Sequence, residues 1–79
     1  MSEFIHRFQC DNDFSFDVEN AIDYTLQEYE MELNMVLSAQ DNCIVLLGSN
    51  DYEMRKFTFC LEYENWQGLL MPFIGVYVD

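Results

Sequence analysis

Carboxylates are the side chains of this sequence most able to do chemistry. There are 15 Asp and Glu residues against three Lys and Arg, which gives a formal net charge of -12. Such a surface repels nucleic acid and anionic membranes, so neither is expected to bind directly. The composition therefore predicts a basic protein partner, although adaptation to a saline cytoplasm and simple solubility are the alternative explanations of the charge.

Catalytic patterns are missing from the sequence. The only histidine, His6, lies in a segment that alternates between apolar and polar residues, where a structural role is favoured over that of a general base. There is no glycine-rich phosphate loop, no nucleophile elbow, and no cysteine next to a second histidine. We therefore expect a protein that is not an enzyme and needs no cofactor.

One segment resembles the first half of a calcium-binding EF-hand loop, because oxygen-bearing side chains alternate from Asp11 to Glu19. The pattern then fails. Phe16 occupies the sixth position, where the loop needs glycine, and Ile22 occupies the twelfth, where it needs a bidentate glutamate. We interpret the segment as a turn and helix cap, with Asp17 as the N-cap, and expect no metal site.

The stretch from Asp17 to Leu37 is the longest one with helical periodicity, and it contains six acids and no base. At 100° per residue its apolar side chains fall on one stripe, as a helix facing a core requires. The stripe consists of Val18, Ile22, Leu26, Tyr29, Leu33, Val36 and Leu37. We expect one long helix over this stretch, with Phe16 and Ala21 forming a hydrophobic staple at its start.

The opposite face of this predicted helix carries the candidate site. A helix that is only structural would place bases near its C-terminus and four residues after its acids, and this one does neither. Its acids instead flank an outward ridge of tyrosine and methionine, which is typical of an apolar interface with a charged rim. The candidate partner-binding residues are Asp13, Asp17, Glu19, Asp23, Tyr24, Glu28, Glu30, Met31, Glu32 and Met35.

The rest of the sequence predicts strands at residues 3–10, 43–47, 55–63 and 69–78, separated by turns at 48–51 and 64–68. Pro72 suggests an edge position or a bulge near the start of the last strand. The expected fold is α+β: a single small domain over residues 1–79 in the order β-α-β-β-β, with one long helix packed on one face of an antiparallel sheet. The first strand could pair with either the second or the fourth.

The three cysteines, at positions 10, 43 and 60, form no C-x-x-C motif and are odd in number. We interpret them as reduced, mostly buried side chains, which are typical of a cytosolic protein. The first ten residues lack the apolar run of a signal peptide, and no segment is long enough to span a membrane. We therefore expect a cytoplasmic protein, in the bacterial host if a phage encodes it.

Carboxylate spacing gives the function hypothesis. In a helix that rises about 1.5 Å per residue, Glu19, Asp23 and Glu30 lie about 6 and 10 Å apart along the axis, similar to phosphates along a strand. This predicts a stoichiometric inhibitor that mimics nucleic-acid charge and blocks the basic groove of a nucleic-acid-handling enzyme.

In size, charge and lack of catalytic residues, the chain resembles the small acidic counter-defence proteins of phages as a class: anti-CRISPR, anti-restriction and uracil-DNA glycosylase inhibitors. The resemblance implies a CRISPR effector, a nuclease or a repair enzyme as the partner, with the CRISPR effector favoured for its long basic channels. One alternative is an immunity protein or antitoxin that neutralises a basic nuclease toxin. Another is an acidic accessory subunit or homodimer that uses the Tyr24, Met31 and Met35 ridge, although we expect a monomer in isolation.

Overall fold

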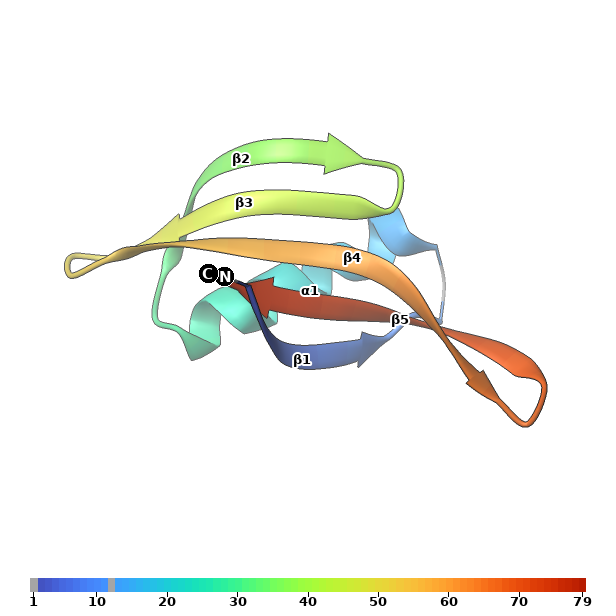
Figure 1. Cartoon of the computed structure of the whole chain (residues 1–79). Helices are drawn as coiled ribbons and strands as arrows, with labels where there is room; N and C mark the ends of the chain where they lie inside the picture. The colour runs from blue at the N-terminus through green and yellow to red at the C-terminus, as the bar shows by residue number, and fades with distance from the viewer. Residues whose placement is uncertain (1, 12) are drawn as a thin grey trace.

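The computed structural model describes residues 2–11 and 13–79, which form one helix and five strands. All strand pairs are antiparallel, and the sheet order is β1-β5-β4-β3-β2. Figure 1 shows the helix packed on one side of the sheet, so the expected α+β class is confirmed. The elements are β1 (Glu3–Gln9), α1 (Phe14–Glu28), β2 (Glu32–Gln40), β3 (Cys43–Ser49), β4 (Met54–Trp66) and β5 (Leu69–Val78).

The helix is shorter than the periodicity predicted, and its expected second half is the additional strand β2. Glu30 has a φ of 55°, which ends the helix in the left-handed conformation. The Glu30 amide bonds to the Gln27 carbonyl and the Met31 amide bonds to the Leu26 carbonyl. These two bonds form a Schellman C-cap, which satisfies the last carbonyls of the helix without a glycine.

The N-terminal cap is also displaced from the predicted position. Asp13, not Asp17, is the N-cap, and its carboxylate accepts a hydrogen bond from the Phe16 amide at 2.9 Å. The Ser15 hydroxyl donates to the same carboxylate oxygen. Because α1 begins at Phe14, Phe16 lies inside the first turn and is exposed, so the predicted staple between Phe16 and Ala21 is wrong.

The core lies between α1 and the three central strands of the sheet. The predicted alternation in β4 is confirmed, because Phe57 and Phe59 are fully buried under the helix. Gly48 of β3 permits this close packing, since a Cβ atom there would lie 2.7 Å from the Leu26 side chain. The other buried apolar residues are Cys10, Phe14, Val18, Ala21, Leu26, Met31, Leu46, Ile74, Val76 and Val78.

Strand pairing settles two questions that the sequence left open. β1 pairs with β5, so it lies at one edge of the sheet while β2 lies at the other. Pairing between β1 and β5 stops at Phe73, so Pro72 lies where β5 is itself an edge, as predicted. Beyond this point β4 and β5 continue alone as a hairpin arm that projects from the domain (Figure 1).

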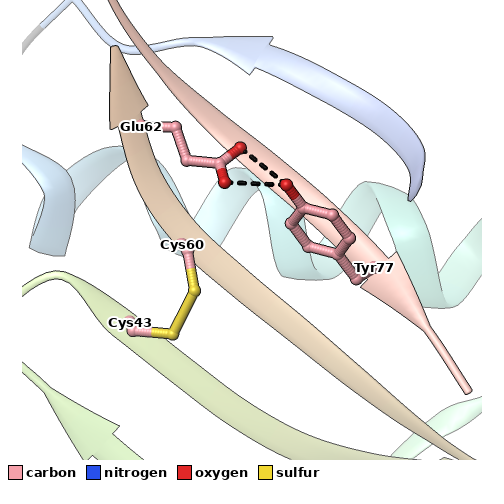
Figure 2. The surroundings of a disulfide bond; sticks show 4 residues. All are labelled: Cys43, Cys60, Glu62 and Tyr77. Carbon is pink, nitrogen blue, oxygen red and sulfur yellow. Dashed lines mark hydrogen bonds between the residues drawn. A yellow bond between two sulfur atoms is a disulfide. The ribbon is translucent and has the colours of Figure 1, made fainter. Parts of the chain in front are cut away.

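The expectation of three reduced cysteines is wrong. Cys43 and Cys60 are directly opposite one another in the β3–β4 register and form a disulfide (Figure 2). Cys10 is buried and remains a thiol. Burial raises the pKa of the Cys10 thiol above its usual value, and a hydrogen bond with Asp17 raises it further.

Candidate functional site

A groove lined by acidic side chains runs between α1 and β2. It consists of two adjoining hollows of about 590 and 360 Å³, which share Glu19 and Ile22 as lining residues. We define the α1–β2 groove by its rim carboxylates and its apolar floor. The rim is Asp13, Glu19, Asp23 and Asp41, and the floor is Ile22, Leu33 and Ile44.

The groove exists because α1 does not cover the β2 edge of the sheet. Leu33 pairs with Gly48 and Val36 pairs with Leu46, so both face the same side of the sheet as the helix. Even so, Leu33 is 53% exposed, and Val36 is also exposed. Apolar side chains on the helix side of a sheet are normally buried. Their exposure here leaves an apolar floor open beside the rim carboxylates.

The rim carboxylates are not neutralised by bases of the same chain. All three Lys and Arg side chains pair with other acids: Arg7 with Glu64, Arg55 with Glu53, and Lys56 with Asp79, at 2.7, 3.0 and 3.0 Å. In the described part of the chain, none of these six side chains lines the groove. The groove therefore has a negative potential that a basic partner could neutralise.

The sequence-predicted site residues do not form a single face. Asp13, Glu19 and Asp23 reach the groove, whereas Glu30, predicted on the same flank of the helix as Glu19 and Asp23, does not. Tyr24 and Glu28 lie on the opposite flank and line a smaller hollow of about 170 Å³ next to β1. A hydrogen bond to Glu28 raises the pKa of the Tyr24 hydroxyl. The helix thus separates these two groups.

The aromatic side chain of Tyr24 belongs to a small ring cluster at β1. Its ring centroid lies 5.5 Å from that of His6 and 5.4 Å from that of Phe8. His6 faces the helix side of the sheet, because its register partner in β5 is the buried Val76. These contacts hold the Tyr24 ring against the sheet, although the side chain is still 46% exposed.

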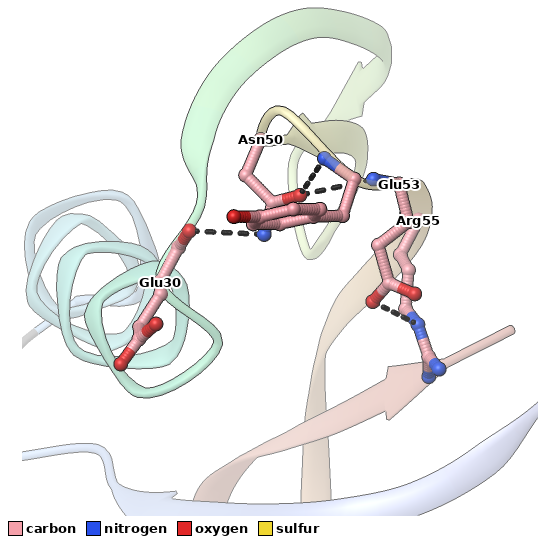
Figure 3. Close-up of polar contacts among 5 residues, drawn as sticks. Glu30, Asn50, Glu53 and Arg55 are labelled. Carbon is pink, nitrogen blue, oxygen red and sulfur yellow. Dashed lines mark hydrogen bonds and ion pairs between the residues drawn. The ribbon is translucent and has the colours of Figure 1, made fainter.

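Glu30 follows the end of α1, and Glu32 is the first residue of β2. Both line a separate hollow of about 350 Å³, which Asp51 also lines. Figure 3 shows that Asn50 links Glu30, after the end of α1, to Glu53 in the turn between β3 and β4. Its side-chain amide donates to the Glu30 carbonyl at 3.1 Å, and its carbonyl oxygen accepts from the Glu53 amide at 2.9 Å. The two glutamates therefore extend the acidic surface away from the groove.

Three of the predicted residues lie elsewhere. Met31, expected on the outward face, is only 7% exposed because it follows the helix cap into the core. Met35 of β2 is exposed, but it pairs with Leu47 of β3 and faces the side of the sheet away from the helix. Asp17 is half-buried in the first turn of α1, where its hydrogen bond with Cys10 raises the pKa of that thiol. The predicted ridge of Tyr24, Met31 and Met35 is therefore wrong.

Sequence reasoning missed the groove residues that come from outside the helix. Asp41 lies in the β2–β3 turn, while Leu33 and Ile44 are contributed by the two strands. One signal was present. Apolar and polar residues alternate from Met31 to Met35, which is typical of a strand. The helical stripe overlaps this alternation.

The β4–β5 arm is a second exposed region that the sequence did not indicate. Its apolar side chains extend beyond the core, and the base of the arm forms a hollow of about 410 Å³ with β1. Arg7 lies over the Phe73 ring there, 4.0 Å from its centroid. The exposed apolar residues of the arm are Tyr63, Trp66, Leu69, Leu70 and Met71.

Metal-ligand groups and membrane-spanning helices are both absent from the described residues. Over residues 2–11 and 13–79, no three His, Cys, Asp or Glu side chains are grouped to hold a metal ion. Across the same residues, no helix has the length and apolar character needed to span a membrane. No protein-family model, curated protein or solved structure matches the chain.

Proposed function

We propose that this protein is a stoichiometric inhibitor that binds a basic nucleic-acid-handling protein through the α1–β2 groove. One observation carries the proposal: four rim carboxylates border an apolar floor in which Leu33 is exposed and Ile22 and Ile44 are half-buried, and every Lys and Arg of the chain is paired elsewhere. A solvated surface needs no exposed apolar floor. A charged rim around an apolar centre is the usual arrangement of a protein–protein interface.

The helix supports mimicry of nucleic-acid charge because it holds carboxylates at fixed spacing. Glu19 and Asp23 are one turn apart, about 6 Å along the axis, which is of the same order as the spacing of phosphates along a strand. The opposite side of α1 is packed on the core through Val18 and Ala21. The carboxylates are thus carried on a rigid element, and binding costs less conformational entropy than it would on a loop.

The partner that fits this groove carries Lys and Arg on an exposed surface with an apolar contact at its centre. Enzymes that hold nucleic acid in a basic channel have such surfaces, and CRISPR effectors have long ones. The high negative charge would also speed association with these proteins by electrostatic steering. Restriction and DNA-repair enzymes offer the same chemistry over a shorter surface.

The proposal is tested by measuring binding and inhibition against a panel of purified enzymes: a CRISPR effector, a restriction enzyme, uracil-DNA glycosylase and a basic nuclease toxin. The informative variant is Glu19→Lys with Asp23→Lys, which leaves the Asp13 cap intact. Exposed ion pairs are worth up to about 1 kcal/mol, so reversing two charges should cost about 1 to 4 kcal/mol, roughly 5- to 700-fold in Kd.

The matched control is Glu3→Lys with Glu28→Lys, which changes the net charge equally but lies away from the groove. If both double variants weaken binding equally, net charge rather than the groove is responsible, and the proposed site is wrong. The association rate should fall as NaCl rises from about 50 to 500 mM. Binding to the toxin alone would favour an immunity protein, and binding to none of the panel would count against the proposal.

A further inference from the structure

β2 is an edge strand with unusual side chains for its position. Edge strands are commonly protected from pairing with other chains by charges, by proline, by β-bulges or by short length. β2 spans nine residues, and none of its residues from Leu33 to Gln40 is charged or proline. In a chain with 15 acids, this neutral edge is a local exception.

Both faces of β2 expose apolar side chains. Leu33 and Val36 face the helix side of the sheet, Met35 faces the other side, and all three are about half exposed or more. Leu37 is 48% exposed as well. A strand that paired with this edge would cover apolar surface on both faces at once, in addition to forming backbone hydrogen bonds.

The other edge of the sheet differs. β1 has seven residues and includes Glu3, His6 and Arg7, and its register with β5 shifts between Phe4 and His6. β2 contains two shifts, at Asn34 and Leu37, so register shifts occur at both edges and do not distinguish them; the ladder of β2 with β3 continues from Glu32 to Gln40. Among the described strands, β2 is therefore the edge with the longer neutral surface.

We propose that β2 pairs antiparallel with β2 of a second copy of this chain, which joins two sheets into one. The absence of charged side chains between Leu33 and Gln40 favours this occupant. A basic strand would meet no carboxylate between Leu33 and Gln40, whereas a neutral strand with apolar side chains on both faces matches the edge, and β2 is such a strand. Antiparallel pairing also places the two Glu32 side chains at opposite ends of the seam.

Pairing of this kind has a consequence for the α1–β2 groove. A two-fold axis perpendicular to the sheet keeps both helices on the same face. The two grooves then lie on either side of the β2 pair, and the exposed Leu33 and Val36 of each copy lie between them on the helix side of the joined sheet. The pairing itself depends on the edge and not on the proposed inhibition, so either can fail alone.

Sedimentation of the purified protein, without any partner, tests the proposal. From about 10 to 500 μM the sedimentation coefficient should rise from that of a monomer to that of a dimer. Because two chains of charge -12 repel one another, the dimer should be favoured as NaCl rises from about 50 to 500 mM. Binding to a basic partner depends on salt in the opposite direction, so the two associations are distinguishable.

The variant Met35→Lys with Leu37→Lys should reduce dimer association by about tenfold or more, because it puts charge on the seam. The matched control is Leu69→Lys with Leu70→Lys, which adds the same charge to the β4–β5 arm and should leave the dimer intact. A wild-type protein that stays monomeric throughout overturns the proposal. So does loss of the dimer only in the arm variant.

Amide hydrogen exchange of the wild type gives a second measurement, which does not depend on whether a variant folds. Exchange at residues 33–40 should slow as protein concentration rises, while exchange at residues 3–9 should not change. Slowing at residues 3–9 instead would place the seam at β1 and refute pairing through β2.

Discussion

Leu26 and Leu37 give the sharpest test of the strand assignment that creates the groove. Both belong to the apolar stripe of a helix over residues 17–37, and that helix predicts that both are buried. In the structure Leu26 is 6% exposed, under the core side of α1, and Leu37 is 48% exposed on β2. The substitutions Leu26→Ala and Leu37→Ala should therefore have very different costs.

The magnitudes follow from burial. Removing a buried leucine side chain and leaving a cavity costs about 2 to 5 kcal/mol, and we expect about 3 kcal/mol for Leu26→Ala. A half-exposed leucine loses about half of a transfer free energy of roughly 2 kcal/mol and leaves no cavity, so Leu37→Ala should cost about 1 kcal/mol. For a domain of this size, 1 kcal/mol lowers Tm by about 4 to 8 °C.

Urea and thermal unfolding should be followed by far-UV circular dichroism at low micromolar protein, where association through β2 is weak. The fluorescence of Trp66 is a poor reporter, because this side chain is exposed on the arm. Equal losses of stability in the two variants would mean that Leu37 is buried. The helix would then extend through residue 37, and the groove as described would not exist.

Two further predictions concern the disulfide and the outer face of the sheet. When the protein is unfolded in a thiol alkylating reagent without reductant, mass spectrometry should show one adduct, on Cys10. Reduction before alkylation should raise the number to three. Three adducts without reductant would contradict the disulfide. The Tyr77 hydroxyl donates to both carboxylate oxygens of Glu62 at 2.9 and 2.7 Å, and this hydrogen bond raises the pKa of Tyr77 (Figure 2). The stability from this contact should be fully present below a pH of about 10 and be lost as pH rises through the raised pKa. In a titration at 295 nm Tyr24 and Tyr77 should therefore both ionise late, and Glu62→Gln should remove the delay of Tyr77 while leaving that of Tyr24.

Local patterns were enough to predict much of the fold. The alternation of Phe57 and Phe59 placed them in the core, because the side-chain period of a strand is set by its own backbone. The start of the helix near Asp13 and the edge position of Pro72 follow from equally local chemistry, although the cap was predicted four residues too late. The lack of nearby bases around the helix acids was also visible in the sequence.

Residues 31–37 show where local patterns stop being sufficient. Their apolar side chains fit both a helical stripe and a strand alternation, so periodicity alone cannot choose between them. Pairing with β3 decides in favour of a strand, and the left-handed conformation of Glu30 ends the helix and redirects the chain into β2. No glycine marks this turn, and a cap of this kind depends on the contacts of the residues that follow it.

The sequence by itself determined the quantity of negative charge and the scarcity of bases, on which the proposal of a basic partner depends. Tertiary structure decided which carboxylates act together. Asp41 joins Glu19 and Asp23 only because β2 folds back along α1, and Cys43 meets Cys60 only through the β3–β4 register. Both are contacts between residues distant in sequence, and their formation depends on the packing of the whole domain rather than on the preferences of any one segment.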